Sequence, residues 1–391
     1  MQTENSNSEP SNDGAKLVLS CMFAVMITLL LLSTSTISAI VKPRLYDGSI
    51  NELGRYSMTF DAYTHIGDSS DAAVIGIGSS KMREAFDGIL LGELDNGNHD
   101  FYNLALAGDR PFVRMLEIDA IISANPSFVV LEIGPNSFSS LGYPLPESIL
   151  SRMGQLVSLG SVDLEKYPNN ILNESLKNEL PQTHLEQIEY LSSYVPQALE
   201  ETIEIEILGH FGLESIASSF ECSGVNANVR CVPLPNDPTY DDYLRYPIQF
   251  RDSLSLIKSG NHSLSIEEFY GPLLDKYVNR SYHNPEGVVN QNQIAYEYMI
   301  EKFTSAGIGV ILVGLPYNPV LLNRLAIGQW DYYNSTLDNY SNLELVTIVD
   351  MVWDEDWEER HFNDYTHMSR DGEILFSNKL IEEISWLMDG D

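Results

Sequence analysis

The chain has 391 residues, with 22 Lys and Arg against 56 Asp and Glu, which gives a formal net charge of −34, and 43% of its residues are hydrophobic. This length and apolar content allow a sizeable core in one or two domains, so disorder is not the default. The acidic residues are spread along the chain and we find no basic patch, which excludes a nucleic-acid partner because the surface repels phosphate. Such a surface fits either an ordinary acidic protein or one adapted to high salt, where the carboxylates are screened.

The N-terminal region carries a long apolar segment. Residues 1–15 are polar and aperiodic, which predicts a disordered tail. Residues 17–41 contain no charged side chain, and a helix of that length crosses a hydrocarbon core of ~30 Å. We therefore predict a transmembrane helix over 16–41 and a juxtamembrane linker over 42–70, with a cleaved secretory signal as the alternative. A long domain after such an anchor is translocated largely regardless of charge, so we expect a single-pass cell-membrane protein with an extracytoplasmic domain.

Two later stretches alternate short apolar runs, typical of buried parallel strands, with amphipathic helices. The first has strands at 72–78, 101–106 and 127–133 and a helix at 110–124. The second has helices at 292–306, 319–333 and 369–388 and strands at 309–315 and 343–349. This rhythm predicts an α/β domain with a central, mostly parallel sheet, assembled from a first part at 71–140 and a second part at 291–391.

Residues 141–290 lack that rhythm, and we interpret them as a large insertion or cap. The insertion contains Cys222 and Cys231, and the third cysteine, Cys21, lies in the predicted membrane helix. In an oxidising compartment Cys222 and Cys231 could close a short disulfide loop, and two unrelated free thiols are the alternative.

A serine follows the first predicted strand. In Gly78-Ser79-Ser80, Ser80 stands where the N–H groups that begin a helix can stabilise developing negative charge, which is a usable position for a nucleophile. Ordinary turn and helix-capping chemistry is the alternative for the same residues.

Two further candidates follow the next two strands. Gly108 comes after the second strand and Asn136 after the third. The carboxyl ends of parallel strands share one crevice, so both residues can converge on Ser80. A glycine N–H and an asparagine amide are the donors that an oxyanion hole requires. A turn at Gly108 and a helix cap or Asx-turn at Asn136 are the alternatives.

Near the C-terminus, Asp364 and His367 are three residues apart. A serine nucleophile needs a base to take its proton, and a histidine base needs a carboxylate to set its tautomer and orientation. The two residues therefore supply both partners of Ser80, with an exposed loop histidine as the alternative.

The ordered set Ser80, Gly108, Asn136 and Asp364-x-x-His367 resembles the motif blocks of the SGNH (GDSL-like) hydrolase superfamily, over residues 71–138 and 290–391. The resemblance implies a flavodoxin-like three-layer sandwich, a catalytic triad of Ser80, His367 and Asp364, and an oxyanion hole formed by Ser80, Gly108 and Asn136. The usual Gly-Asp-Ser is Gly-Ser-Ser here, as in membrane-anchored relatives that handle acyl groups on surface polymers, and the usual Gly-x-Asn-Asp ends in Ser137.

We therefore expect a membrane-anchored serine esterase or O-acyltransferase without a cofactor or metal. Its partners would be an acylated small molecule or cell-surface glycan as substrate, the membrane itself, and a membrane protein that donates acyl groups. Two alternatives stay open. One is metal-assisted hydrolysis through His361, Asp364 and His367. The other is an inactive glycan-binding or assembly subunit, with stacking surfaces supplied by a tyrosine-rich part of the insertion, namely Tyr240, Tyr243, Tyr246, Tyr270 and Tyr277.

Overall fold

The structure of the protein is a computed structural model. It describes residues 13–31, 52–106, 108–138, 141, 145–160, 162–192, 240–246, 290–322, 324, 327–362 and 366–388. The chain divides into two compact units, Met1–Arg44 and Leu45–Asp391.

The first unit contains one described helix, α1 (Asp13–Leu31). Several of its large apolar side chains are exposed, among them Leu19 and Phe23. No helix in the described part of the chain is long and apolar enough to span a membrane. Residues 32–41 of the predicted membrane helix lie outside the described residues, so that helix stays a prediction.

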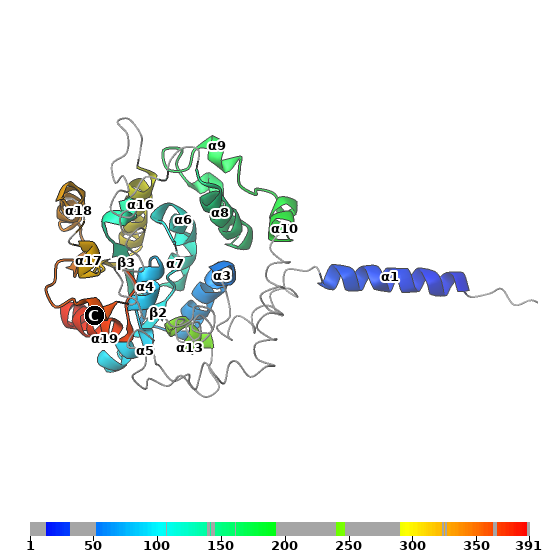
Figure 1. The fold of residues 1–391 in the computed structure, drawn as a ribbon. Helices are drawn as coiled ribbons and strands as arrows, with labels where there is room; N and C mark the ends of the chain where they lie inside the picture. Colours follow the sequence, from blue (N-terminus) through cyan, green and yellow to red (C-terminus); the bar gives the residue numbers. More distant parts are fainter. Residues whose placement is uncertain are drawn as a thin grey trace, which may run out of the picture. The chain divides into compact units, whose positions relative to one another are not determined.

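The second unit is built on a five-stranded, all-parallel sheet with the strand order β2-β1-β3-β4-β5. Figure 1 shows the helices of this unit around the sheet. The strands are β1 (Ala73–Ile77), β2 (Asp100–Asn103), β3 (Phe128–Ile133), β4 (Gly309–Gly314) and β5 (Val346–Asp350). This confirms the predicted α/β class, with strands contributed from both sides of the middle region. The order 2-1-3-4-5 is one of the two common orders of doubly wound sheets.

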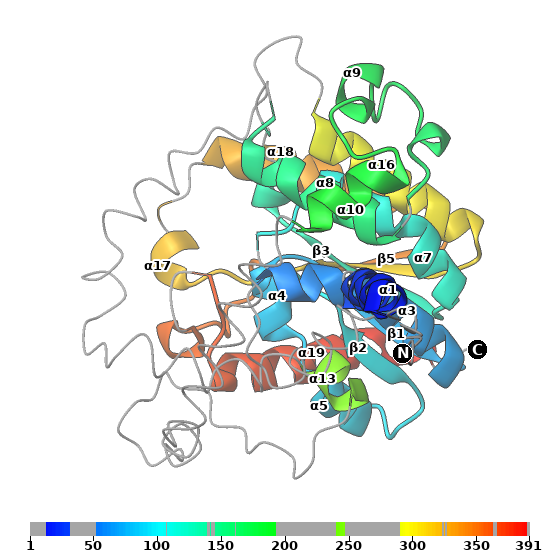
Figure 2. The same cartoon turned by 90° about the vertical axis from the view of Figure 1, so that its right-hand side faces the viewer.

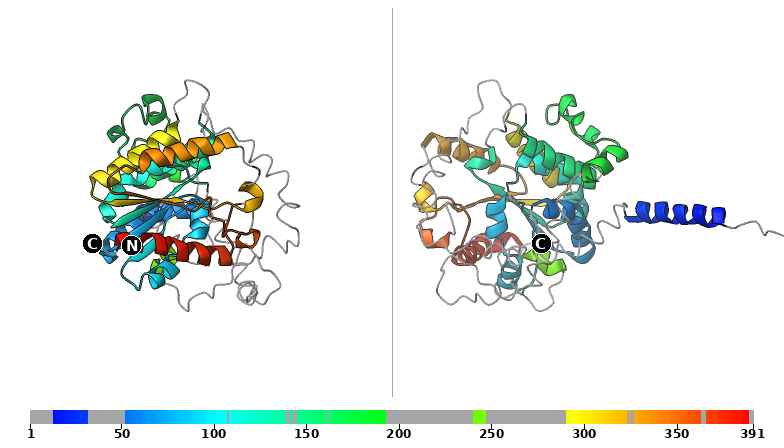
Figure 3. Two further views of the ribbon diagram at one scale, coloured as in Figure 1. Left: turned by 90° about the vertical axis from the view of Figure 1, so that its left-hand side faces the viewer. Right: turned by 45° about the vertical axis from the view of Figure 1, so that its right-hand side comes forward.

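Helices cover both faces of the sheet, which explains why β1 and β3 are buried throughout and are apolar apart from Glu132. On one face, Val74, Val130 and Val313 pack with Phe376 and Leu380 of α19 (Arg370–Met388). Strand side chains alternate, so Ile75, Val129 and Leu312 face the other side. Yellow α16 (Gln291–Ser305) and red α19 lie on opposite sides of the edge-on sheet (Figure 2; Figure 3, left). The arrangement is consistent with a three-layer sandwich.

The remaining described helices connect the strands or belong to the middle region. Those around β1, β2 and β3 are α3 (Glu52–Ser69), α4 (Ser80–Ala85), α5 (Gly88–Leu94), α6 (Pro111–Arg114), η1 (Met115–Glu117), α7 (Ile118–Ala124) and η2 (Pro135–Phe138). The middle region contributes α8 (Glu147–Gly160), η3 (Leu164–Lys166), α9 (Glu174–Lys177), α10 (His184–Ser192) and α13 (Tyr240–Arg245). The C-terminal part adds α17 (Pro319–Leu322), α18 (Ile327–Tyr340) and η4 (Glu359–His361).

Two predicted helices are wrong as single elements. The helix predicted at 110–124 consists of α6, η1 and α7. The 3₁₀ turn brings residues three apart onto one side, so the buried Arg114 and Glu117 form an ion pair of 2.8 Å. The helix predicted at 319–333 divides into α17 and α18.

Candidate active site

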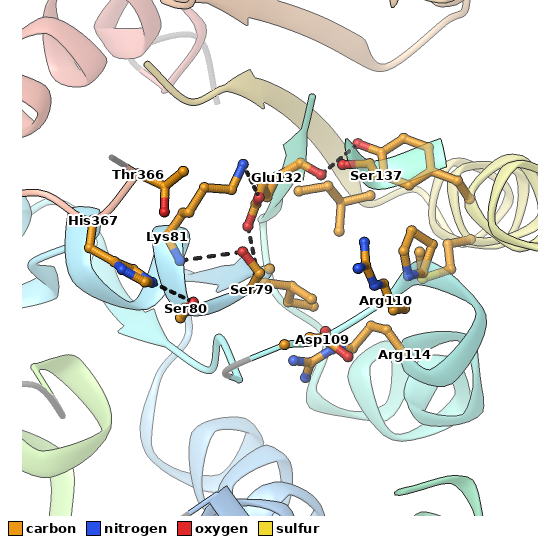
Figure 4. Close-up of a pocket in the computed structure, with 17 residues that line it drawn as sticks. Ser79, Ser80, Lys81, Asp109, Arg110, Arg114, Glu132, Ser137, Thr366 and His367 are labelled. Atoms are coloured by element: carbon orange, nitrogen blue, oxygen red, sulfur yellow. Dashed lines mark hydrogen bonds and ion pairs between the residues drawn. The ribbon is translucent and has the colours of Figure 1, made fainter. Parts of the chain in front are cut away.

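A pocket of about 350 Å³ lies at the carboxyl ends of β1 and β3. Ligands of doubly wound sheets bind in the crevice where the strand order reverses, which in this sheet lies between these two strands. The residues that line the pocket are Ile77, Gly78, Ser79, Ser80, Lys81, Gly108, Asp109, Arg110, Pro111, Arg114, Leu131, Glu132, Ser137, Tyr296, Met299, Thr366 and His367. The fold therefore gathers Ser80, Gly108 and His367 around one cavity. Figure 4 shows Ser80 and His367 side by side at its wall.

Ser80 is the first residue of α4, and its side chain meets His367. The Oγ of Ser80 and the Nε2 of His367 are 2.7 Å apart, although 287 positions separate the residues. Figure 4 shows the imidazole directed at the serine hydroxyl. Ser79 is the N-cap, and its hydroxyl accepts the N–H of Lys81 at 3.3 Å. Ser79 therefore caps the helix, and the next serine, Ser80, is the one whose hydroxyl contacts the histidine.

The segment that carries His367 is fixed on its C-terminal side. Met368 forms an antiparallel bridge with Phe362. The hydroxyl of Ser369 donates to the carbonyl of Arg360 at 2.8 Å and accepts the N–H of Gly372 at 3.3 Å. The start of α19 is thereby tied to the turn η4, and these contacts restrict where the neighbouring imidazole can lie.

The far end of α4 is held by Asn103, the last residue of β2. Its side-chain amide is fully buried and donates to the carbonyls of Arg83 at 2.9 Å and Phe86 at 2.6 Å. Carbonyls at a helix C-terminus have no partner within the helix, so Asn103 satisfies groups that burial would otherwise penalise.

Gly108 reaches the pocket because the chain after β2 keeps following β1. The N–H groups of Leu104 and Leu106 donate to the carbonyls of Gly76 and Gly78, both at 2.9 Å. Gly108 has φ +62°, in the left-handed region that favours glycine. Arg152 donates a hydrogen bond to the Gly108 carbonyl.

Other predicted site residues are described in part or not at all. The backbone of Asn136 lies in η2, directly after β3, and its neighbour Ser137 lines the pocket. The side chain of Asn136 is not among those described, and Asp364, Cys222 and Cys231 lie outside the described residues. The triad carboxylate, the amide donor and the disulfide therefore stay predictions.

Beside the serines lies a buried ion pair that the sequence reasoning missed. Lys81 Nζ is 2.8 Å from Glu132 Oε1, and each side chain is 7% exposed. The other carboxylate oxygen of Glu132 accepts the N–H of Ser79 at 2.6 Å. Burial alone would raise the pKa of Glu132, but Lys81 and the N–H of Ser79 hold it below the ordinary value. A charged residue in the apolar run of 128–133 was the available signal, because a buried charge needs a partner.

A second buried charge cluster supports the pocket wall. Arg114 is 1% exposed; its Nε is 2.7 Å from Asp109 Oδ2, and its Nη1 is 2.8 Å from Glu117 Oε2. Tyr63 donates its hydroxyl to the same oxygen of Glu117 at 2.7 Å. Burial raises the pKa of both carboxyl groups despite the guanidinium between them. The cluster links α3, α6 and η1, and two of its members, Asp109 and Arg114, line the pocket.

The described residues give the metal-site alternative no support. His361 accepts the N–H of Glu358 with its Nδ1 at 3.0 Å, so that nitrogen has a structural partner. Burial lowers the pKa of His361. Within the described ranges, no three His, Cys, Asp or Glu side chains are grouped to hold a metal ion.

Of the tyrosines in the tyrosine-rich stretch, Tyr246 has a described side chain. It is buried, and its hydroxyl donates to Glu373 of α19 at 3.0 Å. This tyrosine packs against the sheet domain and presents no stacking surface to solvent.

The fold and this site define an α/β protein with a serine–histidine pair at the switch point of a parallel sheet. No protein-family model matches the chain, and no curated protein is significantly similar to it.

Proposed function

We propose that this protein is a serine esterase or O-acyltransferase with Ser80 as its nucleophile. The observation that carries the proposal is the 2.7 Å contact between Ser80 Oγ and His367 Nε2 at the wall of the pocket. A nucleophile within hydrogen-bond reach of its base is the arrangement that activates a serine hydroxyl. The position of the pair at the strand-order reversal, where doubly wound proteins bind ligands, also favours a catalytic site.

The reaction follows from this geometry. Nε2 of His367 takes the proton of Ser80 while Oγ bonds to the ester carbonyl carbon, and the carbonyl becomes an oxyanion. When the ester bond breaks, His367 returns that proton to the departing alkoxide, which leaves as an alcohol. Water or a sugar hydroxyl then attacks the acyl-enzyme and gives its proton to His367. The bond between the acyl carbon and Oγ breaks, and His367 passes that proton to Oγ, which restores Ser80. Asp364 is proposed to receive the Nδ1–H of His367 and so fix the tautomer.

The N–H groups of Ser80 and Gly108 and the side-chain amide of Asn136 are proposed to bind the oxyanion. Support comes from the position of Gly108 in the pocket lining and from the turn η2, which carries Asn136 and Ser137 past the end of β3. Such donors act on charge that develops only in the transition state.

The motif order and the strand order both favour a flavodoxin-like member of the SGNH superfamily. The proposed substrates are acyl or acetyl esters of small molecules or cell-surface glycans. The uncharged segment 17–41 and the exposed apolar side chains of α1 favour attachment to the cell membrane, with the site on the extracytoplasmic side.

The test is hydrolysis of an aryl acetate by the full-length protein in detergent, at low and at high salt. Ser80→Ala is expected to lose at least ~10³-fold in kcat, because the proposed acyl-enzyme forms on the Ser80 hydroxyl. Ser79→Ala is the matched control: it removes a helix cap, which costs about 1 kcal/mol of stability, and it leaves the nucleophile in place. Activity of Ser80→Ala equal to wild type would refute the proposal. A folded wild-type protein with no activity would favour the inactive glycan-binding subunit.

A further inference from the structure

Three atoms of Ser79, the residue before the nucleophile, are held by hydrogen bonds. Its N–H donates to Glu132 at 2.6 Å, and its hydroxyl accepts the N–H of Lys81 at 3.3 Å. Its carbonyl accepts the N–H of Arg83 at 3.0 Å. Two of these contacts are local to α4. The bond to Glu132 is the one that ties the start of the nucleophile helix to a neighbouring strand.

Glu132 is itself fixed within the sheet. It lies near the end of β3, and its backbone carbonyl accepts the hydroxyl of Tyr296 at 3.3 Å. One carboxylate oxygen pairs with Lys81, whose ammonium also donates to Tyr317 at 3.3 Å and lies 4.7 Å from the centre of that ring. The second oxygen is thereby aimed at Ser79.

Gly78 permits this approach. A Cβ at position 78 would lie 2.6 Å from the Cβ of Glu132 and 2.7 Å from its Oε2, closer than real Cβ atoms come. The glycine of Gly78-Ser79-Ser80 is thus explained by the carboxylate that lies against the turn.

A buried ion pair is weak grounds for stability, because desolvating two charges offsets their attraction. This pair does something that an apolar pair of the same size cannot do: it presents a carboxylate oxygen to a backbone N–H beside the nucleophile. We propose that Glu132, held by Lys81, is a positioning residue that fixes the Ser79-Ser80 turn and so aims the Ser80 hydroxyl at His367. The effect on catalysis rests on the proposed function, whereas the effect of Glu132 on the geometry of the Ser79-Ser80 turn does not.

The experiment compares two neutral double variants, Lys81→Met/Glu132→Gln and Lys81→Met/Glu132→Met. Both remove the ion pair, and glutamine and methionine are similar in length, but only glutamine keeps an oxygen that can accept the N–H of Ser79. Full-length proteins are compared by melting temperature, by amide hydrogen exchange over residues 78–82, and by kcat and KM for the aryl acetate.

The variant with methionine at 132 is expected to have a kcat about 10- to 100-fold below that of the variant with glutamine, with a similar KM, because small misplacement of a reacting group is costly. Its amides at 78–82 should also exchange faster. A purely structural role would change the melting temperatures and leave this kcat ratio near one. Equal kcat together with equal exchange would overturn the inference.

A measurement on the wild-type protein covers the case in which the double variants do not fold. The Ser79 amide proton should be strongly protected and shifted downfield, as expected for a short bond to a carboxylate. Exchange as fast as that of an exposed amide would overturn the inference. Neither exchange measurement needs turnover. The proposed function fails if the wild type has no activity that depends on Ser80, and the inference fails if the Ser79 amide is not protected, so the two failures can be told apart.

Discussion

Arg114→Met is expected to destabilise the fold strongly, and more so at neutral than at acidic pH. The guanidinium is 1% exposed and pairs with two buried carboxylates, at 2.7 Å and 2.8 Å. Removing one partner of a buried ion pair typically costs 3 to 5 kcal/mol, because the charge that remains is uncompensated, so we expect a loss of about that size near pH 7.5.

The pH dependence has a definite sign. The pKa values of Asp109 and Glu117 are already raised by burial, and without the guanidinium they should rise further. A carboxyl whose pKa is higher in the folded state takes up protons on folding, so its contribution to stability falls as the pH rises from the ordinary pKa towards the raised one. A carboxyl that is protonated in the folded state and ionised in the unfolded state over two pH units changes the free energy of unfolding by roughly 2.7 kcal/mol over that interval. When the pH is lowered from 7.5 to 5.5, the free energy of unfolding of Arg114→Met should therefore rise by up to ~2.7 kcal/mol.

Urea unfolding of the full chain, followed by tryptophan fluorescence at both pH values, measures this effect. Lys166→Met is the matched control, because Lys166 forms an exposed pair with Asp119 at 2.7 Å and its removal should change little at either pH. A loss below about 1 kcal/mol for Arg114→Met, or the same loss at both pH values, would refute the reasoning.

Three further outcomes are expected. Gly108→Ala and Gly97→Ala should cost a similar ~1 kcal/mol of stability, because both glycines have positive φ. Only Gly108→Ala should lower kcat, since Gly108 lines the pocket and its Cβ would lie 2.9 Å from the guanidinium of Arg152, whereas a Cβ at position 97 would meet nothing within 4 Å beyond its chain neighbours. Equal kcat in the two variants would contradict a role for Gly108. Asn103→Ala should lower the free energy of unfolding in urea by about 2 to 3 kcal/mol, because it removes the side-chain donor of two buried carbonyls. Asn342→Ala, which removes an exposed amide, should leave the free energy of unfolding unchanged. The melting temperature should rise from low to high salt because screening relieves repulsion within a chain of net charge −34; a flat or falling curve would argue against the acidic-surface interpretation.

The strands could be predicted because an apolar run between turn residues suits a strand that is buried on both faces. The strand predicted at 343–349 is displaced, and begins at Val346. Leu343 and Leu345 are 44% and 49% exposed, and Leu345 has φ +59°. Leu343 and Leu345 are therefore apolar residues of a turn, and their apolar character alone led to the prediction of a strand there.

The sequence predicts the candidate site only through the order of short motifs along the chain. The approach of Ser80 to His367 across 287 positions has no local signal, and its expectation came from the order of short motifs along the chain. The ion pair of Lys81 with Glu132 and the capping role of Asn103 depend on which strands are neighbours. Side-chain partners of this kind become visible only once the sheet order is known.

The nucleophile and its base can be tested by labelling the full-length protein with a fluorophosphonate serine probe in low and in high salt, and locating the adduct by mass spectrometry. Wild type is compared with Ser80→Ala, Ser79→Ala and His367→Ala. We expect an adduct on Ser80 that persists in Ser79→Ala and disappears in His367→Ala, because the hydroxyl needs the imidazole 2.7 Å away to lose its proton. An adduct on Ser79, an adduct on Ser80 that does not depend on His367, or no adduct on well-folded protein in either salt would contradict the assignment of Ser80 and His367 as nucleophile and base.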